Sequence, residues 1–281
     1  MHADKIVAMI ALIALTFGAG LEVNREQLIS ILKNVSLLVR ALLANFVIVP
    51  LLGVLLAKLF HLPPLVATGF LLMAIAPGVP LVLASVRKRG GRLGFAVELA
   101  VVLPLLSLLT VPLTAHFVLP TEAAGELPLR QVVTTLLLFQ VLPLLIGLIV
   151  ARRIPAIAPR LVQVSRITFF VTILLVLILL VPKFVSAVAL VYGSNGMLAM
   201  LCLAVLSMVT GWLLGGPARE DRRVLGIATT LRNIGFCLVI STSNFREPLI
   251  IASVMAYLLV QFVVVTIFGR VFVQRTKAAA G

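Results

Sequence analysis

Long apolar runs follow one another along almost the whole chain, and they limit most strongly what it can fold into. The residues are 62% hydrophobic and only 11% charged, whereas soluble domains carry about 25% charged residues. A helix rises roughly 1.5 Å per residue, so about 20 apolar residues cross a bilayer core. Unbroken runs of this length predict helices, not the alternating strands of a membrane barrel. We therefore expect an all-α polytopic membrane protein in which residues 1–281 form a single transmembrane domain.

Nine runs are long enough to be transmembrane helices. They lie at residues 5–22, 35–58, 64–86, 92–119, 128–151, 161–182, 185–215, 223–244 and 248–270. The first run could instead be a signal peptide, but Lys5 is the only positive residue before it and no A-x-A cleavage site is clear. We expect that it is retained as the first of nine spans.

The basic residues predict the orientation of these spans. Sixteen of the 23 Lys and Arg residues fall in loops on one predicted face, five on the other, and Arg40 and Arg232 within spans. Positive loops stay in the cytoplasm, which predicts an outside N-terminus and a cytoplasmic C-terminus in the cell (plasma or inner) membrane. The net charge of +14 then reflects topology and attraction to anionic membrane lipid, and we expect no nucleic-acid partner.

Sequence signals for catalysis or cofactors are missing. Cys202 and Cys237 fall in different spans, and the three histidines are scattered, so no cluster has the spacing of a metal site. No glycine-rich loop precedes a Lys-Ser or Lys-Thr pair, which argues against a nucleotide site. We expect no enzymatic activity, no metal and no cofactor.

Two spans carry helix-breaking or polar residues in their middle. The third contains Pro77, Gly78 and Pro80; proline removes a main-chain donor and glycine frees the released segment. The eighth contains the sequence Arg232-Asn233-Ile234-Gly235 at similar depth. Either feature alone could be a simple kink or an isolated polar contact. Together they predict two broken helices.

The arrangement of the spans around these breaks predicts an inverted repeat. The third and eighth spans run in opposite directions, and each lies between two uninterrupted runs, as in secondary transporters whose broken helices cross near the bilayer midplane. Irregular backbone at that depth is tolerated where it is buried or lines a cavity. Candidate substrate-binding residues are those at or next to the breaks: Arg232, Asn233, Thr229, Thr230, Pro77 and Gly78. Asn45, Gln140 and Gln261, which lie elsewhere in the spans, are interpreted as packing or helix–helix contacts.

Arg232 and Glu98 are charged residues within the predicted core of the bilayer. Such residues usually face the protein interior or a water-filled path. Arg232 lies nine residues after Arg223, and Glu98 lies six residues after Arg92. These separations predict similar depths in the bilayer for Arg232 and Glu98, and we expect the two to form an ion pair. Three roles stay open: a purely structural pair, an arginine that binds the anionic substrate, and a glutamate that exchanges protons for coupling.

Three short motifs resemble those of the bile acid:sodium symporter family. They are FGAGL from Phe17 to Leu21, Ala76-Pro77-Gly78 in one broken helix, and Asn233-x-Gly235 in the other. The resemblance, which extends over nearly the whole chain, implies a core domain with two crossing broken helices, at 35–119 and 185–270. It also implies a panel domain at 5–22, 128–151 and 161–182. Family substrates are organic anions, commonly coupled to sodium.

The same resemblance exposes two departures at the family's sodium sites. The family motif Glu-x-x-x-Gln-Asn-x-Gly has Ala228 at the glutamate position and Arg232 at the glutamine position. The family's Ser-Asn pair after Pro-Gly corresponds to Val82 and Leu83. Two unit charges about 4 Å apart repel by about 4 kcal/mol at an effective dielectric constant of about 20. We therefore expect degraded sodium sites, with sodium or protons as candidate coupling ions.

These features predict a secondary transporter that moves a small organic anion by alternating access. Arg232 would act as a built-in cation where relatives recruit sodium. The alternative is a membrane sensor or partner subunit on the same scaffold that no longer transports, and a channel is a third possibility.

Overall fold

The computed structural model is built of helices and describes residues 3–23, 34–78, 80–120, 128–245 and 247–278. Six helices among these residues are long and apolar enough to cross a membrane. They are Val35–Leu59, Leu93–Val118, Leu129–Arg153, Ala158–Val176, Gly196–Leu214 and Pro248–Phe268. Three shorter apolar helices accompany them, at Lys5–Leu21, Pro64–Ile75 and Ile234–Asn244. The chain is thus a polytopic, all-helical membrane protein.

The uninterrupted helices have the following bounds. They are α1 (Ala3–Leu21), α3 (Val35–Leu43) continued by η2 (Ala44–Ile48) and α4 (Val49–Leu59), α7 (Leu93–Val118), α9 (Leu129–Leu136) continued by η3 (Leu137–Val141) and α10 (Leu142–Arg153), α11 (Ala158–Gly193), α12 (Gly196–Leu214) and α15 (Pro248–Ala278). The segments η2 and η3 are single π-helical turns within long helices.

Two apolar runs form interrupted helices. The first consists of α5 (Pro64–Ile75) and α6 (Pro80–Arg89), and the second of α13 (Arg219–Thr230) and α14 (Ile234–Asn244). Pro80 begins α6, where a missing N–H costs nothing because the first N–H groups of a helix have no partner within it. Gly235 lies inside α14. The breaks therefore include residues 76–78 and 231–233, which contain Pro77 and Arg232.

The boundary between α11 and α12 differs from the expected one. The sequence predicts separate spans at 161–182 and 185–215, but α11 continues to Gly193, and Lys183 falls inside a helix instead of a loop. The turn follows at Ser194 and Asn195, where Asn195 has a left-handed φ of 60°. Asparagine is among the few residues that adopt this conformation readily. Pro182 does not end the helix, and neighbouring helices commonly allow proline within a membrane span.

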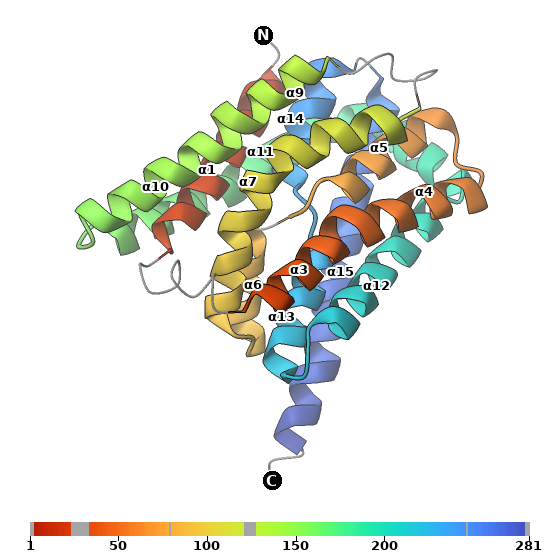
Figure 1. The fold of residues 1–281 in the computed structure, drawn as a ribbon. Helices are drawn as coiled ribbons and strands as arrows, with labels where there is room; N and C mark the ends of the chain where they lie inside the picture. Colours follow the sequence, from red (N-terminus) through yellow and green to blue (C-terminus); the bar gives the residue numbers. More distant parts are fainter. Residues whose placement is uncertain (1–2, 24–33, 79, 121–127, 246, 279–281) are drawn as a thin grey trace.

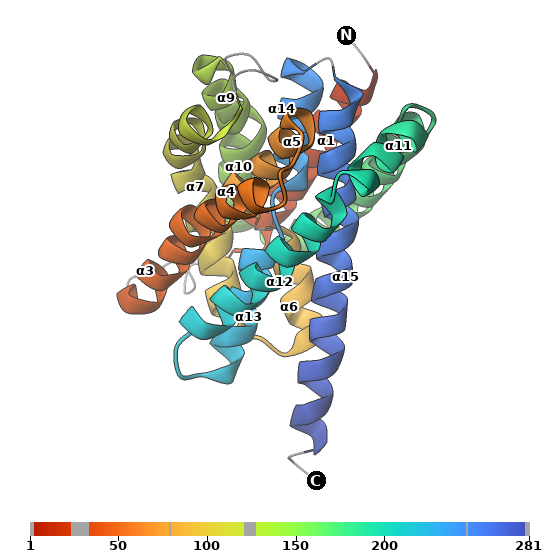
Figure 2. The same ribbon diagram turned by 90° about the vertical axis from the view of Figure 1, so that its right-hand side faces the viewer.

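Contacts between helices divide the molecule into two flanks (Figure 1, Figure 2). On one flank α1 packs against both α10 and α11, and on the other α12 packs against α4 and α13. The helix α15 packs against α5. The breaks of the two interrupted helices lie between these flanks, where they meet each other.

Reciprocal glycines allow the close approach of α1 and α10. A Cβ atom on Gly20 would lie 2.9 Å from the main-chain N of Leu148, and one on Gly147 would lie 3.0 Å from the N of Leu21. These neighbours are backbone atoms, so a side chain at either glycine forces the helices apart. Gly20 belongs to the FGAGL segment, and this contact gives that segment a physical role.

We expect Gly147→Ala to lower the free energy of unfolding by about 1–3 kcal/mol, the usual cost of overpacking. The measurement is the thermal stability of the detergent-purified protein. Gly193→Ala is the matched control, because no heavy atom lies within 4 Å of a Cβ built there. Equal melting temperatures for Gly147→Ala and the parent would contradict the tight contact.

Candidate functional site

The two interrupted helices meet at their breaks. Pro77 and Arg232 form an isolated antiparallel bridge, and the N–H of Asn233 donates to the carbonyl of Ala76 over 3.1 Å. Gly78 is required at this point, since a Cβ on it would lie 2.6 Å from the Cα of Arg232. The structure therefore brings together four of the predicted site residues: Pro77, Gly78, Arg232 and Asn233.

The carbonyl groups at the end of α5 are satisfied by the second interrupted helix. A helix leaves its last four carbonyls without partners of its own. Here Arg232 Nε donates to Met73 O over 2.9 Å, and Arg232 Nη2 donates to Ala74 O. The thiol of Cys237 contacts Leu72 O at 3.4 Å. Arg232 thus caps α5 from the second break, which is more than 150 residues away in the sequence.

The guanidinium of Arg232 is surrounded by neutral oxygens. The residue is 1% exposed, and Arg232 Nη1 donates to Asn45 Oδ1 over 3.2 Å. Together with Met73 O and Ala74 O, this amide oxygen accepts from all three guanidinium nitrogens. A cation at the C-terminal end of a helix also interacts favourably with the helix dipole. The buried positive charge is therefore compensated by hydrogen bonds and by the end of α5.

Side-chain amides bind polar groups of the second break. The N–H of Arg232 donates to Gln261 Oε1 over 2.8 Å. Asn233 Oδ1 accepts from the N–H of Phe236 over 3.1 Å and so caps the N-terminus of α14. Asn233 Nδ2 donates to Gln140 Oε1. The N–H groups of Arg232 and Phe236 thereby gain side-chain partners at the break.

Gln140 connects the second break to α7. Its Nε2 donates to Ser107 Oγ over 2.8 Å and to Pro104 O over 3.3 Å. Pro104 lies inside α7, and a proline leaves the carbonyl four residues before it without its usual partner and disturbs the helix around it. Three elements, α14, η3 and α7, therefore share one buried hydrogen-bond network.

Asn45 and Gln140 both lie in π-helical turns. Asn45 belongs to η2 and Gln140 to η3, and such turns occur often at functional sites. The two amides contact the consecutive residues Arg232 and Asn233. Sequence reasoning interpreted Asn45, Gln140 and Gln261 as packing or helix–helix contacts, and in the structure all three bind the second break from other helices. A usable signal was present, since each is an amide in an otherwise apolar span.

The structure holds Thr229 and Thr230 in contacts with the main chain. Thr229 Oγ1 donates to Ser207 O of α12 over 2.7 Å, and Thr230 Oγ1 donates to Gly226 O over 2.8 Å. Gly211 of α12 packs directly against Thr229. These two residues stabilise α13 and its contact with α12, and they do not take part in the bridge between the breaks.

Glu98 is buried in α7 and takes part in an interaction of its own. An ion pair between Glu98 and Arg232 stays a prediction, beside a guanidinium that already has three oxygen partners.

The positions that the resemblance assigns to sodium ligands carry apolar, buried side chains. Val82 and Ala228 are fully buried, and Leu83 is 2% exposed. None of the three side chains offers an oxygen atom. Among the described residues, no group of three or more His, Cys, Asp or Glu side chains could hold a metal ion.

Interrupted helices that meet inside an apolar helical bundle are typical of membrane transporters. Residues 9–192 match the sodium bile acid symporter family, and the chain belongs to this family. Comparison with individual curated proteins gave no match. The matched region contains the first interrupted helix and ends before the second, so Arg232 lies outside it.

Proposed function

We propose that this chain is a secondary transporter that carries a small organic anion across the cell membrane by alternating access. The nine spans would form an inverted repeat with an outside N-terminus. Residues 35–119 and 185–270 would form the core, with the α11–α12 turn as its revised start near residue 194. The panel would contain 5–22, 128–151 and the helix that begins near 161. Panel and core would rock against each other around the meeting point of the breaks.

The observation that carries this proposal is the cradle of neutral oxygens around Arg232. Two main-chain carbonyls and one amide oxygen accept from the guanidinium, and oxygen atoms of these kinds also bind hard metal cations. In the proposed mechanism Arg232 supplies, as part of the chain, the positive charge that sodium supplies in relatives. Its charge would favour an anion near the breaks.

The loss of oxygen ligands at Val82, Leu83 and Ala228 supports the same proposal. A free sodium ion within about 4 Å of the guanidinium would meet a repulsion of about 4 kcal/mol at an effective dielectric constant of about 20. Sodium would then have neither ligands nor a favourable potential. Glu98 remains the candidate for coupling to protons, because a buried carboxyl group in a membrane span can serve as a proton relay.

We expect anion uptake by proteoliposomes to change by less than about twofold when a sodium gradient is replaced by potassium, because an ion without a site cannot shift the conformational equilibrium. The assay would follow radiolabelled organic anions, cholate among them, with and without a pH gradient. Loss of a pH-driven component in Glu98→Gln would assign proton coupling to Glu98. Strong sodium dependence in the parent chain would contradict the built-in cation.

A double variant provides the matched control for this experiment. Arg232→Gln together with Ala228→Glu restores the family residues at both positions, and we expect sodium dependence only in this combination. Each single variant separates the loss of the guanidinium from the gain of the carboxylate. Sodium dependence in Arg232→Gln alone would show that the carboxylate is not needed.

The second candidate function is a sensor or partner subunit that no longer transports. The saturated hydrogen bonding of Arg232 favours it, because a guanidinium with three partners has little capacity left for a substrate. Absence of flux across the whole anion panel, with and without gradients of sodium and protons, would support this candidate over transport. Flux that saturates at low turnover and needs a gradient would exclude a channel.

A further inference from the structure

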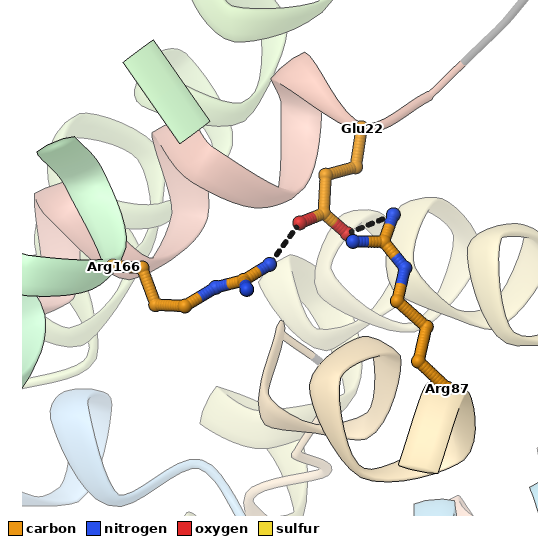
Figure 3. A network of polar contacts seen from close by, with 3 residues as sticks. All are labelled: Glu22, Arg87 and Arg166. Atoms are coloured by element: carbon orange, nitrogen blue, oxygen red, sulfur yellow. Dashed lines mark hydrogen bonds and ion pairs between the residues drawn. The ribbon is translucent and has the colours of Figure 1, made fainter. Parts of the chain in front are cut away.

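Glu22 joins two helices that the proposed function assigns to different domains. Its carboxylate lies just beyond the end of α1, 2.8 Å from Arg166 Nη2 of α11 and 3.2 Å from Arg87 Nη2 of α6. Figure 3 shows the carboxylate between the two guanidinium groups. The Glu22 side chain is 8% exposed, whereas both arginine side chains are almost half exposed. A nearly buried carboxylate is therefore held by two arginines that solvent can reach.

Glu22 and Arg166 lie where two cavities meet, and Arg87 lines the wider one. This wide cavity, the vestibule, has a volume of about 1100 Å³ and is lined by α1, α10, α11 and Arg87. A narrow cavity of about 50 Å³ lies between α1, α11 and Leu83 of α6. Both cavities are lined by Glu22, Val162 and Arg166. The ion pairs of Glu22 thus stand at the neck where the vestibule meets the narrow cavity.

The lining of the wide cavity is strongly positive. It contains Arg87, Arg152 and Arg166, and among the described lining residues Glu22 is the one acidic residue. A concave surface with charges of one sign concentrates counter-ions. The planar guanidinium group also matches the geometry of carboxylates and related oxyanions. The vestibule therefore attracts anions, and at its neck the arginines already hold one, the carboxylate of Glu22.

We propose that Arg87 and Arg166 form an anion subsite at this neck, in which Glu22 is an internal competitor of the substrate. The ligand is the carboxylate or sulfonate group of an organic anion. When the anion takes the place of Glu22, the contact that joins α1 and α11 to α6 is released, and the neck opens. The role in transport rests on the proposed function, whereas anion binding at the two arginines does not.

The test uses inorganic sulfate as the probe on the full chain, purified in a non-ionic detergent. Thermal stabilisation is measured against sulfate concentration, with chloride at matched ionic strength as the reference. We expect Glu22→Gln to lower the half-saturating sulfate concentration about tenfold, because removing the internal competitor raises the fraction of open subsites. Arg166→Gln and Arg87→Gln should abolish the sulfate-specific part of the stabilisation.

Arg152→Gln is the matched control. It removes the same charge from the same cavity, but the structure shows no contact between Arg152 and Glu22 among the described residues. We expect it to keep most of the sulfate effect. Equal sulfate effects in the parent, Arg152→Gln and Arg166→Gln would overturn the proposal, because they would reflect the general action of the salt. If Glu22→Gln does not fold, the sulfate-specific stabilisation of the parent compared with that of Arg166→Gln decides whether the subsite exists.

Two further measurements distinguish the anion subsite from a lipid-binding site and from the proposed transport function. Stabilisation by phosphatidylglycerol that competes with sulfate and is lost in Arg166→Gln would assign the two arginines to a lipid phosphate and overturn the substrate subsite. Sulfate binding that follows the expected pattern in a chain without anion flux would reject the transport function and keep the subsite. Flux without any sulfate effect would reject the subsite and keep transport.

Discussion

Arg232→Ala is expected to destabilise the protein severely and to abolish transport. The substitution leaves Met73 O, Ala74 O and Asn45 Oδ1 without their donor in a buried place. Hydrogen bonds to a charged group contribute about 1.5–3 kcal/mol each, so the three bonds put the loss of unfolding free energy at about 4.5 kcal/mol or more. The measurements are thermal denaturation in detergent and the yield of monodisperse protein.

Two variants sharpen the interpretation of this result. Arg232→Lys keeps the charge, but an ammonium group lacks the planar, forked set of N–H donors with which the guanidinium binds three acceptors. We therefore expect a stability between those of the parent and the alanine variant. Arg153→Ala removes an exposed arginine at the end of α10 and should leave the melting temperature nearly unchanged. A lysine variant as stable as the parent would show that charge alone matters and that the hydrogen-bond geometry does not.

Gly78→Ala is expected to prevent the two interrupted helices from meeting. The new Cβ would lie within 2.6 Å of the Cα of Arg232 and would also overlap the carbonyl of Leu231. Because these neighbours are backbone atoms, no rotamer change relieves the overlap. We expect a loss at or beyond the upper end of the usual overpacking cost of about 1–3 kcal/mol, together with loss of uptake.

Gly94→Ala is the control for this glycine. Gly94 lies near the start of α7, and a Cβ built on it meets no heavy atom within 4 Å. Alanine favours a helix over glycine by about 1 kcal/mol, so this variant should be as stable as the parent or slightly more stable. Similar behaviour of the two alanine variants would mean that the breaks do not approach each other as closely as described.

The sequence predicts the existence of both breaks, because their residues act locally. Proline and glycine at 77, 78 and 80 disturb any helix in which they occur, and a cation in an apolar run needs a special surrounding. The partners of Gln261 and Asn45 are not predicted, for the opposite reason. A lone amide in a span gives no sign of its partner, and only the fold brings these two to the same arginine.

The end of α11 shows a second limit of local reasoning. Pro182 and Lys183 together are typical of a loop, and the sequence predicts that one span ends there and the next begins. The chain turns instead at Asn195, a single residue with a left-handed conformation. A conformation of one residue has no hydropathy signal. The family match likewise ends at residue 192, so it does not extend to Arg232, which the sequence identifies by its charge in an apolar run.

The capping of α5 by Arg232 has a consequence for biosynthesis. Met73 and its donor are 159 residues apart, so a growing chain places α5 in the membrane long before the residue that completes it exists. Until then the carbonyls at the end of α5 must keep water or another donor, because lipid offers none. The first interrupted helix therefore cannot settle in the bilayer by itself. Its insertion is completed only when the second interrupted helix has been synthesised. A late part of the chain is therefore needed to complete the structure of an early part.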